Sequence, residues 1–365
     1  MVRELGGGGS ERQLTEIARS LDPDEFEVHV ACFRPEGLRL RQLEASGVKI
    51  LALPVRSLYR RSAWVGAWIL IRYLRQYRIH LVHTFDAPAT IFGVPAARMA
   101  GIPVVLSSQR AHRQLSTLAS RWMLRLTDRL AHGVVVNCQA LARHLVEDEH
   151  VAQDKVLLCR NGIDTTVFNP AGRRRMTSVA DAGLVAGCVC MLRSEKRLDL
   201  LVEAFRRIAA PGRRLVMVGS GAMLEPLERQ CEALGLGRYC HFEPATDDVA
   251  SWLRSLDIFV LPSRTEGLSN SLMEAMACGC AVVASDAGGN PELVSHLETG
   301  LLFASGDVQA LGDALVRLAA DPALRAGLGS RAAARMARDF TLEMASGRMA
   351  AIYRDRLRRV SPPVR

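Results

Sequence analysis

The segment 263–274 brings together residue types that could bind a polar ligand. Glu266 and Glu274 are separated by seven residues, and a run of hydrophobic residues ends just before them. The small polar residues between them predict a short loop followed by a helix that begins near Ser269 or Asn270. Glu266 would then lie in the loop and Glu274 on the helix, so both carboxylates could face one ligand beside the positive end of the helix.

A nucleotide-sugar has the chemistry that this arrangement could recognise. Sugar hydroxyl groups donate hydrogen bonds to carboxylates, and phosphate accepts them from backbone amides at a helix N-terminus. We therefore expect Glu274 to hold a ribose, Glu266 to contact a donor sugar, and four neighbouring amides to face the phosphates. These amides belong to Gly267, Leu268, Ser269 and Asn270. Alternatively, Glu266 is a solvated loop charge and Glu274 is stabilised by the helix dipole, and the pair alone is compatible with both interpretations.

Two further strand-to-helix junctions could contribute to the same ligand site. At one of them Asn290 fits the position of a helix cap and Pro291 the first helical position, so amides there could also face a donor. At the other, Arg193 and Lys196 follow a strand and could stabilise a diphosphate leaving group. Lys196 is notable because nearly all the basic residues are arginines. The alternative for both cations is a solvated basic turn.

The hydrophobic pattern indicates the elements that would position these junctions. Runs rich in β-branched residues alternate with amphipathic helical segments through the 365-residue chain, which is typical of parallel βαβ units. The expected strands are 27–33, 49–53, 80–84, 104–107 and 133–137 in the first half, and 186–192, 215–218, 258–261 and 281–285 in the second. We predict an α/β protein of the GT-B type, with two doubly wound, Rossmann-like domains facing a central cleft.

We place the domain boundary where turn residues and a charged connector interrupt this pattern. Residues 161–164 have turn chemistry, and residues 172–175 are mostly basic. The predicted parts are an acceptor-side domain at 1–164, a donor domain at 165–338, and a C-terminal helix with a tail at 339–365 that packs back on the first domain. Residues 1–5 are short for the strand expected before four consecutive glycines, so we expect either a clipped strand or a misassigned start.

Taken in order, these motifs resemble those of glycosyltransferase family 4, the large retaining family with the GT-B fold. They include a Gly-Gly loop with Glu-Arg-Gln, Asn-Gly-Ile-Asp followed by Phe, Glu-Lys before a helix, and two glutamates separated by seven residues. In this chain they occupy residues 7–13, 161–168, 195–196 and 266–274. The resemblance therefore spans nearly the whole chain.

The resemblance implies roles for individual residues and a reaction. Glu274 would bind the ribose, Glu266 the transferred sugar, and Arg193 and Lys196 the diphosphate. The glycines expected around the donor are Gly7 and Gly8 at the phosphates and Gly219 and Gly221 at the nucleobase. The implied reaction is a retaining, metal-independent transfer without a cofactor, from a nucleotide-sugar to a glycan or lipid-linked acceptor, as in cell-surface polysaccharide or lipopolysaccharide assembly.

The chain departs from the family pattern at two places. Met191 stands where the family often has an arginine, and we expect Arg193 to replace it from two residues away. Many relatives carry a histidine after the strand at 104–107, where this chain reads Ser-Gln-Arg-Ala-His, and we assign no role to His112. His83 is a candidate acceptor-side residue, with a hydrogen-bonded core histidine as the alternative.

Composition and charge limit the remaining functions. The formal charge is +9, and the residues up to Arg160 carry 22 basic against 15 acidic side chains. No nucleic-acid motif accompanies this charge, so we expect an acidic surface or a phosphorylated substrate as partner instead. The nine cysteines lack zinc spacing, the apolar runs are too short to span a bilayer, and no secretory signal is recognised. We expect a cytoplasmic protein that can associate with the inner face of the plasma membrane.

Other functions of paired Rossmann-like domains fit less well. A nicotinamide-dependent dehydrogenase needs a full glycine fingerprint, which neither 6–11 nor 219–221 completes. Asp247 and Asp248 are adjacent, which predicts a helix start and not a metal site, so we expect no metal. A catalytically weak sugar-nucleotide-binding partner protein is the alternative to an enzyme.

The segment 60–78 is the expected membrane contact. At about 100° per residue its small and aliphatic residues form one stripe suited to a core, and its tryptophans and arginines lie on an adjacent flank. The stripe contains Ala63, Ala67, Leu70 and Leu74, and the flank contains Trp64 and Trp68 with Arg61, Arg72 and Arg75. Such a flank favours anionic headgroups. The alternative keeps the tryptophan rings in the core.

Overall fold

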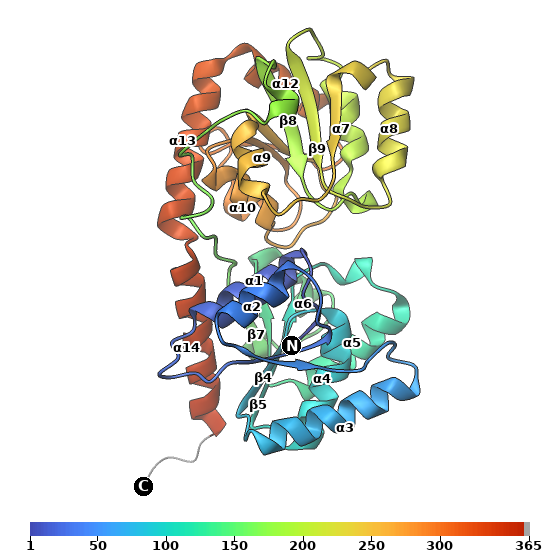
Figure 1. The fold of residues 1–365 in the computed structure, drawn as a ribbon, viewed down its shortest axis with the longest axis vertical. Coiled ribbons are helices and arrows are strands. Elements are labelled where there is room, and N and C mark those ends of the chain that lie inside the picture. The colour runs from blue at the N-terminus through green and yellow to red at the C-terminus, as the bar shows by residue number, and fades with distance from the viewer. Residues whose placement is uncertain (361–365) are drawn as a thin grey trace. The chain divides into compact units, whose positions relative to one another are not determined.

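The computed structural model describes residues 1–360 and divides the chain into two compact units (Figure 1). The first unit contains Met1–Gly162 and the residues from Leu342 onward, and the second is Ile163–Thr341. From the sequence we expected divisions after residues 164 and 338. Each unit is an α/β structure with parallel strands, which confirms the predicted fold class.

The first unit has two parallel sheets, in the orders β1-β2-β3 and β4-β5-β6-β7. The strands are β1 (Val2–Glu4), β2 (His29–Arg34), β3 (Lys49–Ala52), β4 (Leu81–Thr84), β5 (Val104–Gln109), β6 (Gly133–Val136) and β7 (Val156–Leu158). The helices are α1 (Gly9–Ser20), α2 (Leu38–Ala45), α3 (Arg61–Gln76), α4 (Ala87–Ala100), α5 (Leu118–Leu130), α6 (Gln139–Glu147) and α14 (Leu342–Val360). The strand expected ahead of the glycine loop is therefore present, with three residues.

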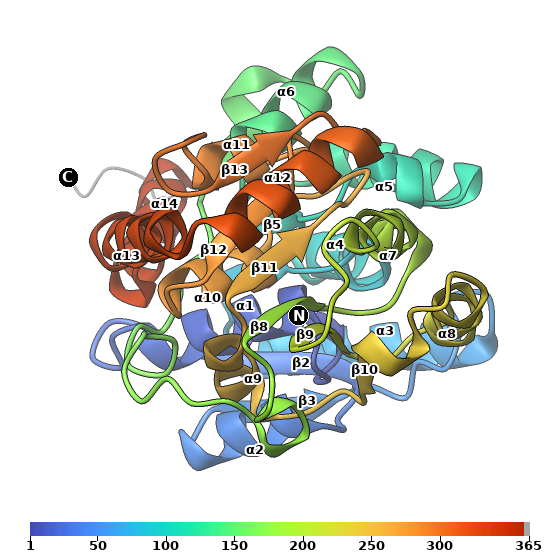
Figure 2. The ribbon, with the colours of Figure 1, turned by 90° about the horizontal axis from the view of Figure 1, so that it is seen from above.

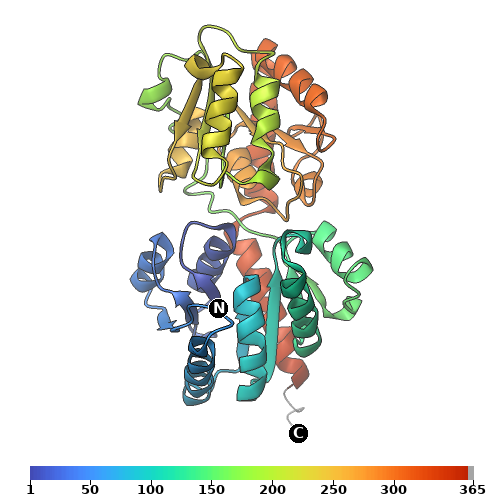
Figure 3. The same ribbon diagram turned by 90° about the vertical axis from the view of Figure 1, so that its right-hand side faces the viewer.

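Two apolar cores cover opposite faces of these sheets. On one side Leu14 and Ile17 of α1 pack with Met349 and Tyr353 of α14. On the other, buried residues of α3 and α4, such as Leu70 and Phe92, form a second cluster. Helix α4 lies between α3 and α5 in this layer (Figure 3). Both faces of the strands are covered, which explains why β5 is buried along its whole length.

The exposure of the tryptophans of α3 shows whether their rings lie in the core or on the surface. Leu70 and Leu74 are buried and Ala63 and Ala67 pack partly against the core, as the predicted stripe requires. Trp64 and Trp68 are 79% and 61% exposed. The alternative that placed these rings in the core is therefore wrong.

The second unit has one six-stranded parallel sheet in the order β10-β9-β8-β11-β12-β13. The strands are β8 (Leu184–Val189), β9 (Arg213–Val218), β10 (Cys240–Glu243), β11 (Ile258–Leu261), β12 (Ala281–Ser285) and β13 (Leu301–Phe303). The helices are α7 (Leu198–Phe205), α8 (Leu224–Ala233), α9 (Val249–Ser255), α10 (Asn270–Ala277), α11 (Asn290–Leu293), α12 (Val308–Ala320) and α13 (Pro322–Asp339). Helices α7, α8 and α12 pack on one side of the strands and α9, α10 and α13 on the other (Figure 2).

The strand order of this sheet reverses between β8 and β11. The chain builds outward from β8 to β9 and β10, then returns to place β11 on the other side of β8. Loops leaving the carboxyl ends of β8 and β11 therefore run to opposite faces of the sheet. Such a topological switch point leaves a crevice, where open α/β sheets bind ligands.

The two crossings of the chain between the units lie beside each other. The amide of Ile163 donates a hydrogen bond to the carbonyl oxygen of Phe340 at 2.9 Å, and Ile163 also forms a parallel bridge with Thr341. After this bridge, α14 packs against α1 and β5 of the first unit. The last helix thus completes the core of the unit that contains the first residues.

Candidate donor site

An ion pair lies at the switch point of the second unit. Lys196, in the turn that follows β8, is 2.6 Å from Oε1 of Glu266, in the loop that follows β11. The hydroxyl of Ser263 donates to the same oxygen at 2.6 Å. The Lys196 and Glu266 side chains are only 17% and 9% exposed. Two of the predicted catalytic residues are therefore in contact. Ser263 completes a cluster of three side chains, and the sequence analysis assigned it no role.

The surroundings keep Lys196 charged. Burial lowers the pKa of its amine, but attraction by the Glu266 carboxylate outweighs burial and raises the pKa above its usual value. The lysine is therefore an ammonium ion at neutral pH. A positive charge held in a largely water-excluded crevice can stabilise developing negative charge on a bound group more strongly than it could in water.

Backbone contacts fix the loop that carries Glu266. The amide of Arg264 donates to the carbonyl of Glu195 at 2.8 Å, which ties the loop to the turn of Lys196. From the other side, the Gly289 amide donates to the Gly267 carbonyl at 3.0 Å. Gly288 has a φ of +57°, and a Cβ there would lie 2.0 Å from the carbonyl oxygen of Glu266. The turn after β12 therefore supports the Glu266 loop through a contact that only glycine allows.

Helix α10 begins where the sequence predicted. Its first residue is Asn270, and the Ser269 hydroxyl caps it by accepting the Leu272 amide at 3.4 Å. Leu268 and Ser269 are buried, and Glu274, one turn into the helix, is 3% exposed. Glu274 lies beyond the first turn of α10, where the helix dipole is strongest, so the dipole considered above does not by itself account for this buried carboxylate.

Asn290 is not the helix cap that the sequence predicted. It is the first residue of α11, which is preceded by Gly289 without a side-chain cap. The Asn290 side chain is fully buried, and its amide donates to the Ser285 carbonyl at 3.1 Å. Its side chain therefore connects the start of α11 to the last residue of β12.

Two glycines near the expected nucleobase position have a structural role. Gly219 and Gly221 follow β9 with φ values of +147° and +158°. A Cβ on them would lie 1.9 Å from the Cys190 carbonyl oxygen and 2.2 Å from that of Leu192. These glycines let the loop after β9 lie directly against the loop after β8. Any part they have in nucleobase binding stays a prediction.

Arg193 lies on the surface of the same turn. Its side chain is 60% exposed, and its guanidinium lies 3.9 Å from the Glu195 carboxylate. Met191, at the position where the family often has arginine, is 44% exposed. The expectation that Arg193 takes over the role of the family's arginine stays a prediction.

The glycine loop of the first unit leads into α1. Gly8 is the N-cap residue, and a Cβ on it would lie 2.2 Å from the Glu11 carboxylate, which folds back over the loop. A Cβ on Gly6 or Gly7 would meet nothing within 4 Å. Burial raises the pKa of Glu11. The expected contact of Gly7 and Gly8 with donor phosphates stays a prediction.

The histidines considered for the acceptor side have structural partners. His83 is buried, and its ring nitrogens lie 2.8 Å from the hydroxyls of Tyr353 and Ser108. Burial holds its pKa well below the usual value, so the ring is neutral. The core interpretation of His83 is therefore the one that the structure supports. His112 stacks on His144 with ring centres 3.7 Å apart.

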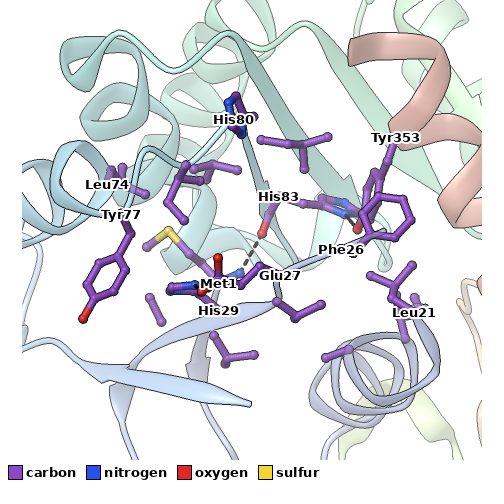
Figure 4. A pocket seen from close by; sticks show the side chains of 18 of the residues that line it. Met1, Leu21, Phe26, Glu27, His29, Leu74, Tyr77, His80, His83 and Tyr353 are labelled. Carbon is purple, nitrogen blue, oxygen red and sulfur yellow. Dashed lines mark hydrogen bonds and ion pairs between the residues drawn. The ribbon is translucent and has the colours of Figure 1, made fainter. Parts of the chain in front are cut away.

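A cavity of about 580 Å³ in the first unit lies at the amino ends of β2 and β4 (Figure 4). Its wall is mostly apolar and includes Phe26, Leu74, Tyr77 and Tyr353. The Met1 nitrogen donates to the His83 carbonyl at 2.6 Å inside it. Ligands of open parallel sheets bind beyond the carboxyl ends of the strands, so this cavity is not at the expected ligand edge.

Two Rossmann-like units, with a switch-point site in the second, form the arrangement of the GT-B fold. Residues 7–167 match the family model described as Glycosyltransferase Family 4, and residues 183–321 match that described as Glycosyl transferases group 1. The chain belongs to this glycosyltransferase family.

Individual relatives agree with this assignment. The lipopolysaccharide core biosynthesis mannosyltransferase LpcC of Rhizobium leguminosarum is 29% identical over 272 residues, which cover 72% of this chain and 74% of that protein. The D-inositol 3-phosphate glycosyltransferase of Mycolicibacterium paratuberculosis is 28% identical, over 83% of this chain and 67% of that protein. The structure of Anabaena HepE in complex with UDP-glucose has a TM-score of 0.83 at 22% identity, covering 97% of this chain and 99% of that one.

The contact between Gly288 and the Glu266 carbonyl can be tested by Gly288→Ala. The methyl group would displace the Glu266 loop, and we expect turnover in a sugar-transfer assay to fall roughly a hundredfold, as for a misplaced catalytic group. Gly306→Ala is the control, because Gly306 also has a positive φ but open space around its Cβ position. It should cost about 1–2 kcal/mol of stability with unchanged turnover. Equal turnover losses in both variants would contradict this role of Gly288.

Proposed function

We propose that this protein is a retaining glycosyltransferase that moves a sugar from a nucleotide-sugar donor to a glycan or lipid-linked acceptor in the assembly of a cell-surface polysaccharide or lipopolysaccharide. The observation that carries the proposal is the buried cluster of Lys196, Glu266 and Ser263 at the switch point. The relative from Rhizobium is named for lipopolysaccharide core synthesis, and the Anabaena structure contains UDP-glucose. The first name supports a surface-glycan product, and the second supports a nucleotide-sugar donor.

The cluster suggests how donor binding and chemistry are divided. Glu274 would accept hydrogen bonds from the ribose, and the amides of residues 267–270 would face the phosphates at the start of α10. Glu266 would accept hydrogen bonds from the transferred sugar. Since Lys196 is held beside Glu266 at 2.6 Å, its ammonium would lie next to the leaving diphosphate while the sugar is bound.

We propose that no metal takes part and that the departing diphosphate accepts the acceptor's proton. Lys196 and Arg193 would supply the positive charge that the diphosphate needs. Asp248 accepts the Ser251 amide at 3.2 Å and begins α9, as the sequence predicted for this pair of aspartates. The new glycosidic bond would then form on the face from which the diphosphate leaves, which retains the anomeric configuration.

The stereochemistry and the metal requirement are tested together. Candidate nucleotide-sugars are screened with water as acceptor, and the first-formed product is observed by proton NMR. We expect the anomeric configuration of the donor to be retained and the rate to be unchanged by EDTA. An inverted first product, or a rate that EDTA abolishes and magnesium restores, would overturn the corresponding part of the proposal.

The two glutamates should affect different kinetic constants. Ribose is bound equally before and during transfer, so Glu274→Ala should raise the donor KM by about tenfold, the effect of losing hydrogen bonds to a charged group. Glu266→Ala should lower kcat by a factor on the order of a hundred or more, because its contacts strengthen in the transition state. Glu225→Ala, an exposed change on α8, is the control. Similar effects of Glu266→Ala and Glu274→Ala on both constants would refute this division.

We also propose that the first unit associates with an anionic membrane through α3. Trp64 and Trp68 are exposed, and the Arg72 guanidinium lies 5.6 Å from the Trp68 ring centre. Helix α5 adds exposed residues that sequence reasoning missed: Leu118 is 81% and Trp122 is 67% exposed. Apolar and aromatic side chains beside arginines on helices that flank α4 suit a headgroup interface. None of the helices in the described part of the chain combines the length and apolarity needed to cross a bilayer.

Co-sedimentation with vesicles of phosphatidylglycerol and phosphatidylcholine tests this surface. We expect binding that is lost in a Trp64→Ser, Trp68→Ser double variant and weakened in Arg61→Gln, Arg72→Gln. Arg75 is left unchanged, because it donates hydrogen bonds to the carbonyls of Met99 and Ala100 at the end of α4. Arg206→Gln, Arg229→Gln on the second unit removes the same charge and should leave binding intact. Absence of vesicle binding by the unmodified protein would contradict the proposal.

A further inference from the structure

Two arginines that follow β5 have opposite electrostatic environments. Arg113 is 1% exposed and forms two hydrogen bonds with Asp128, at 2.7 and 2.9 Å, and it lies 3.7 Å from Glu149. Arg110, three residues earlier, donates to the neutral Asn161 side chain at 2.8 Å. Among residues 1–360, no aspartate or glutamate forms an ion pair with Arg110. Arg113 is thus a neutralised structural cation, whereas Arg110 has no counter-ion within the part of the chain that the structure describes.

The immediate neighbours of Arg110 do not supply negative charge. Its guanidinium lies 4.9 Å from the centre of the Phe85 ring, and its Nε is buried without a hydrogen-bond partner. Burial raises the pKa of the Cys159 thiol and of the Tyr353 hydroxyl, so both are neutral at pH 7. Burial lowers the pKa of Arg110 to about 10, which still leaves it charged. A partly buried cation with an unused donor is costly unless a ligand completes it.

The segment that carries Arg110 is held rigidly at the carboxyl edge of the first unit's sheet. Gln109, at the end of β5, accepts a hydrogen bond from the Arg113 guanidinium at 3.1 Å and donates one to the Ala111 carbonyl. On the other side of Arg110, Gln13 of α1 bonds both the carbonyl and the amide of Gly162, next to Asn161. The ends of β5, of the segment after β7 and of α1 therefore converge around Arg110, at the edge where parallel sheets bind ligands.

We propose that Arg110 binds an oxyanion, a phosphate or carboxylate group, carried by the sugar acceptor. A guanidinium has a planar fork of donors that matches such a group in two hydrogen bonds. The proposal identifies the acceptor as an anionic sugar or its phosphate ester, which is consistent with the excess of basic residues up to Arg160. It rests on the proposed function only in naming the acceptor as the carrier of the anion.

Calorimetric titration separates the two possible anions without any turnover. The unmodified protein is titrated with glucose, glucose 6-phosphate and glucuronate at constant ionic strength. We expect one of the charged sugars to bind at least tenfold more tightly than glucose, and this identifies the anion. Arg110→Gln should abolish the preference, Arg110→Lys should retain part of it, and Arg41→Gln, an exposed change on α2, should leave it intact. No preference for either anion, or a preference that survives Arg110→Gln, would overturn the proposal.

A thermal unfolding comparison distinguishes a ligand-binding arginine from a structural one. Arg110→Gln removes a partly buried charge that has no carboxylate partner among residues 1–360, so its Tm should equal or exceed that of the unmodified protein. Arg113→Gln leaves Asp128 and Glu149 without their partner, so its Tm should fall by several degrees. A Tm loss in Arg110→Gln as large as that in Arg113→Gln would make Arg110 structural and refute the proposal. Because neither experiment measures transfer, failure here and failure of the proposed transferase activity are separately visible.

Discussion

Parallel strands end at one edge of a sheet, and the placement of the donor-side residues depends on this constraint. Lys196 lies in the turn after β8, and Glu266 lies in the loop after β11. The two strands are neighbours in the sheet, although the two residues are 70 positions apart in the sequence. The reversal of strand order between β8 and β11 sends their loops to opposite faces, which opens space for a ligand between them. The ion pair then needs only short loops to form. The same constraint explains the need for glycine at positions 219, 221 and 288. Loops that leave one edge of the sheet pass very close to one another, and a Cβ at these positions would collide with the neighbouring loop.

The sequence was informative where a feature is local and less so where it depends on a distant partner. Strands 258–261 and 281–285 were predicted with the bounds that the structure has, since each is a continuous apolar run buried on both faces. The short strands β7, β10 and β13 were missed. Three residues in β7 and in β13 are too few for a periodic signal, and the four residues of β10 include His241 and Glu243, so they form no apolar run. Asn290 has a side chain that suits a cap, yet its amide is used by the Ser285 carbonyl across the end of β12. Ser263 could have been suspected only as the first polar residue after a buried strand.

The many arginines of this chain differ in what neutralises them, and the sequence does not reveal this difference. Arg113 and Arg110 are three residues apart, yet Arg113 is enclosed by two carboxylates and Arg110 contacts the neutral side chains of Asn161 and Phe85. Arg75 is satisfied by the carbonyls that end α4, whereas Arg72 lies over an exposed indole. Net charge therefore favours anionic partners in general, and only the contacts distinguish which arginines are available to bind one.

The contact between His83 and Tyr353 joins residues 270 positions apart, and Met349 and Tyr353 of α14 belong to the core that contains Leu14 and Ile17. A chain emerging from the ribosome would release the whole of Ile163–Thr341 before α14 is available. Domains generally fold as units during synthesis, so the second unit can fold while the first still exposes the apolar side of α1. The first unit therefore begins before the second in the sequence but completes its apolar core after it. Completion of the first unit's core during synthesis therefore requires translation through α14.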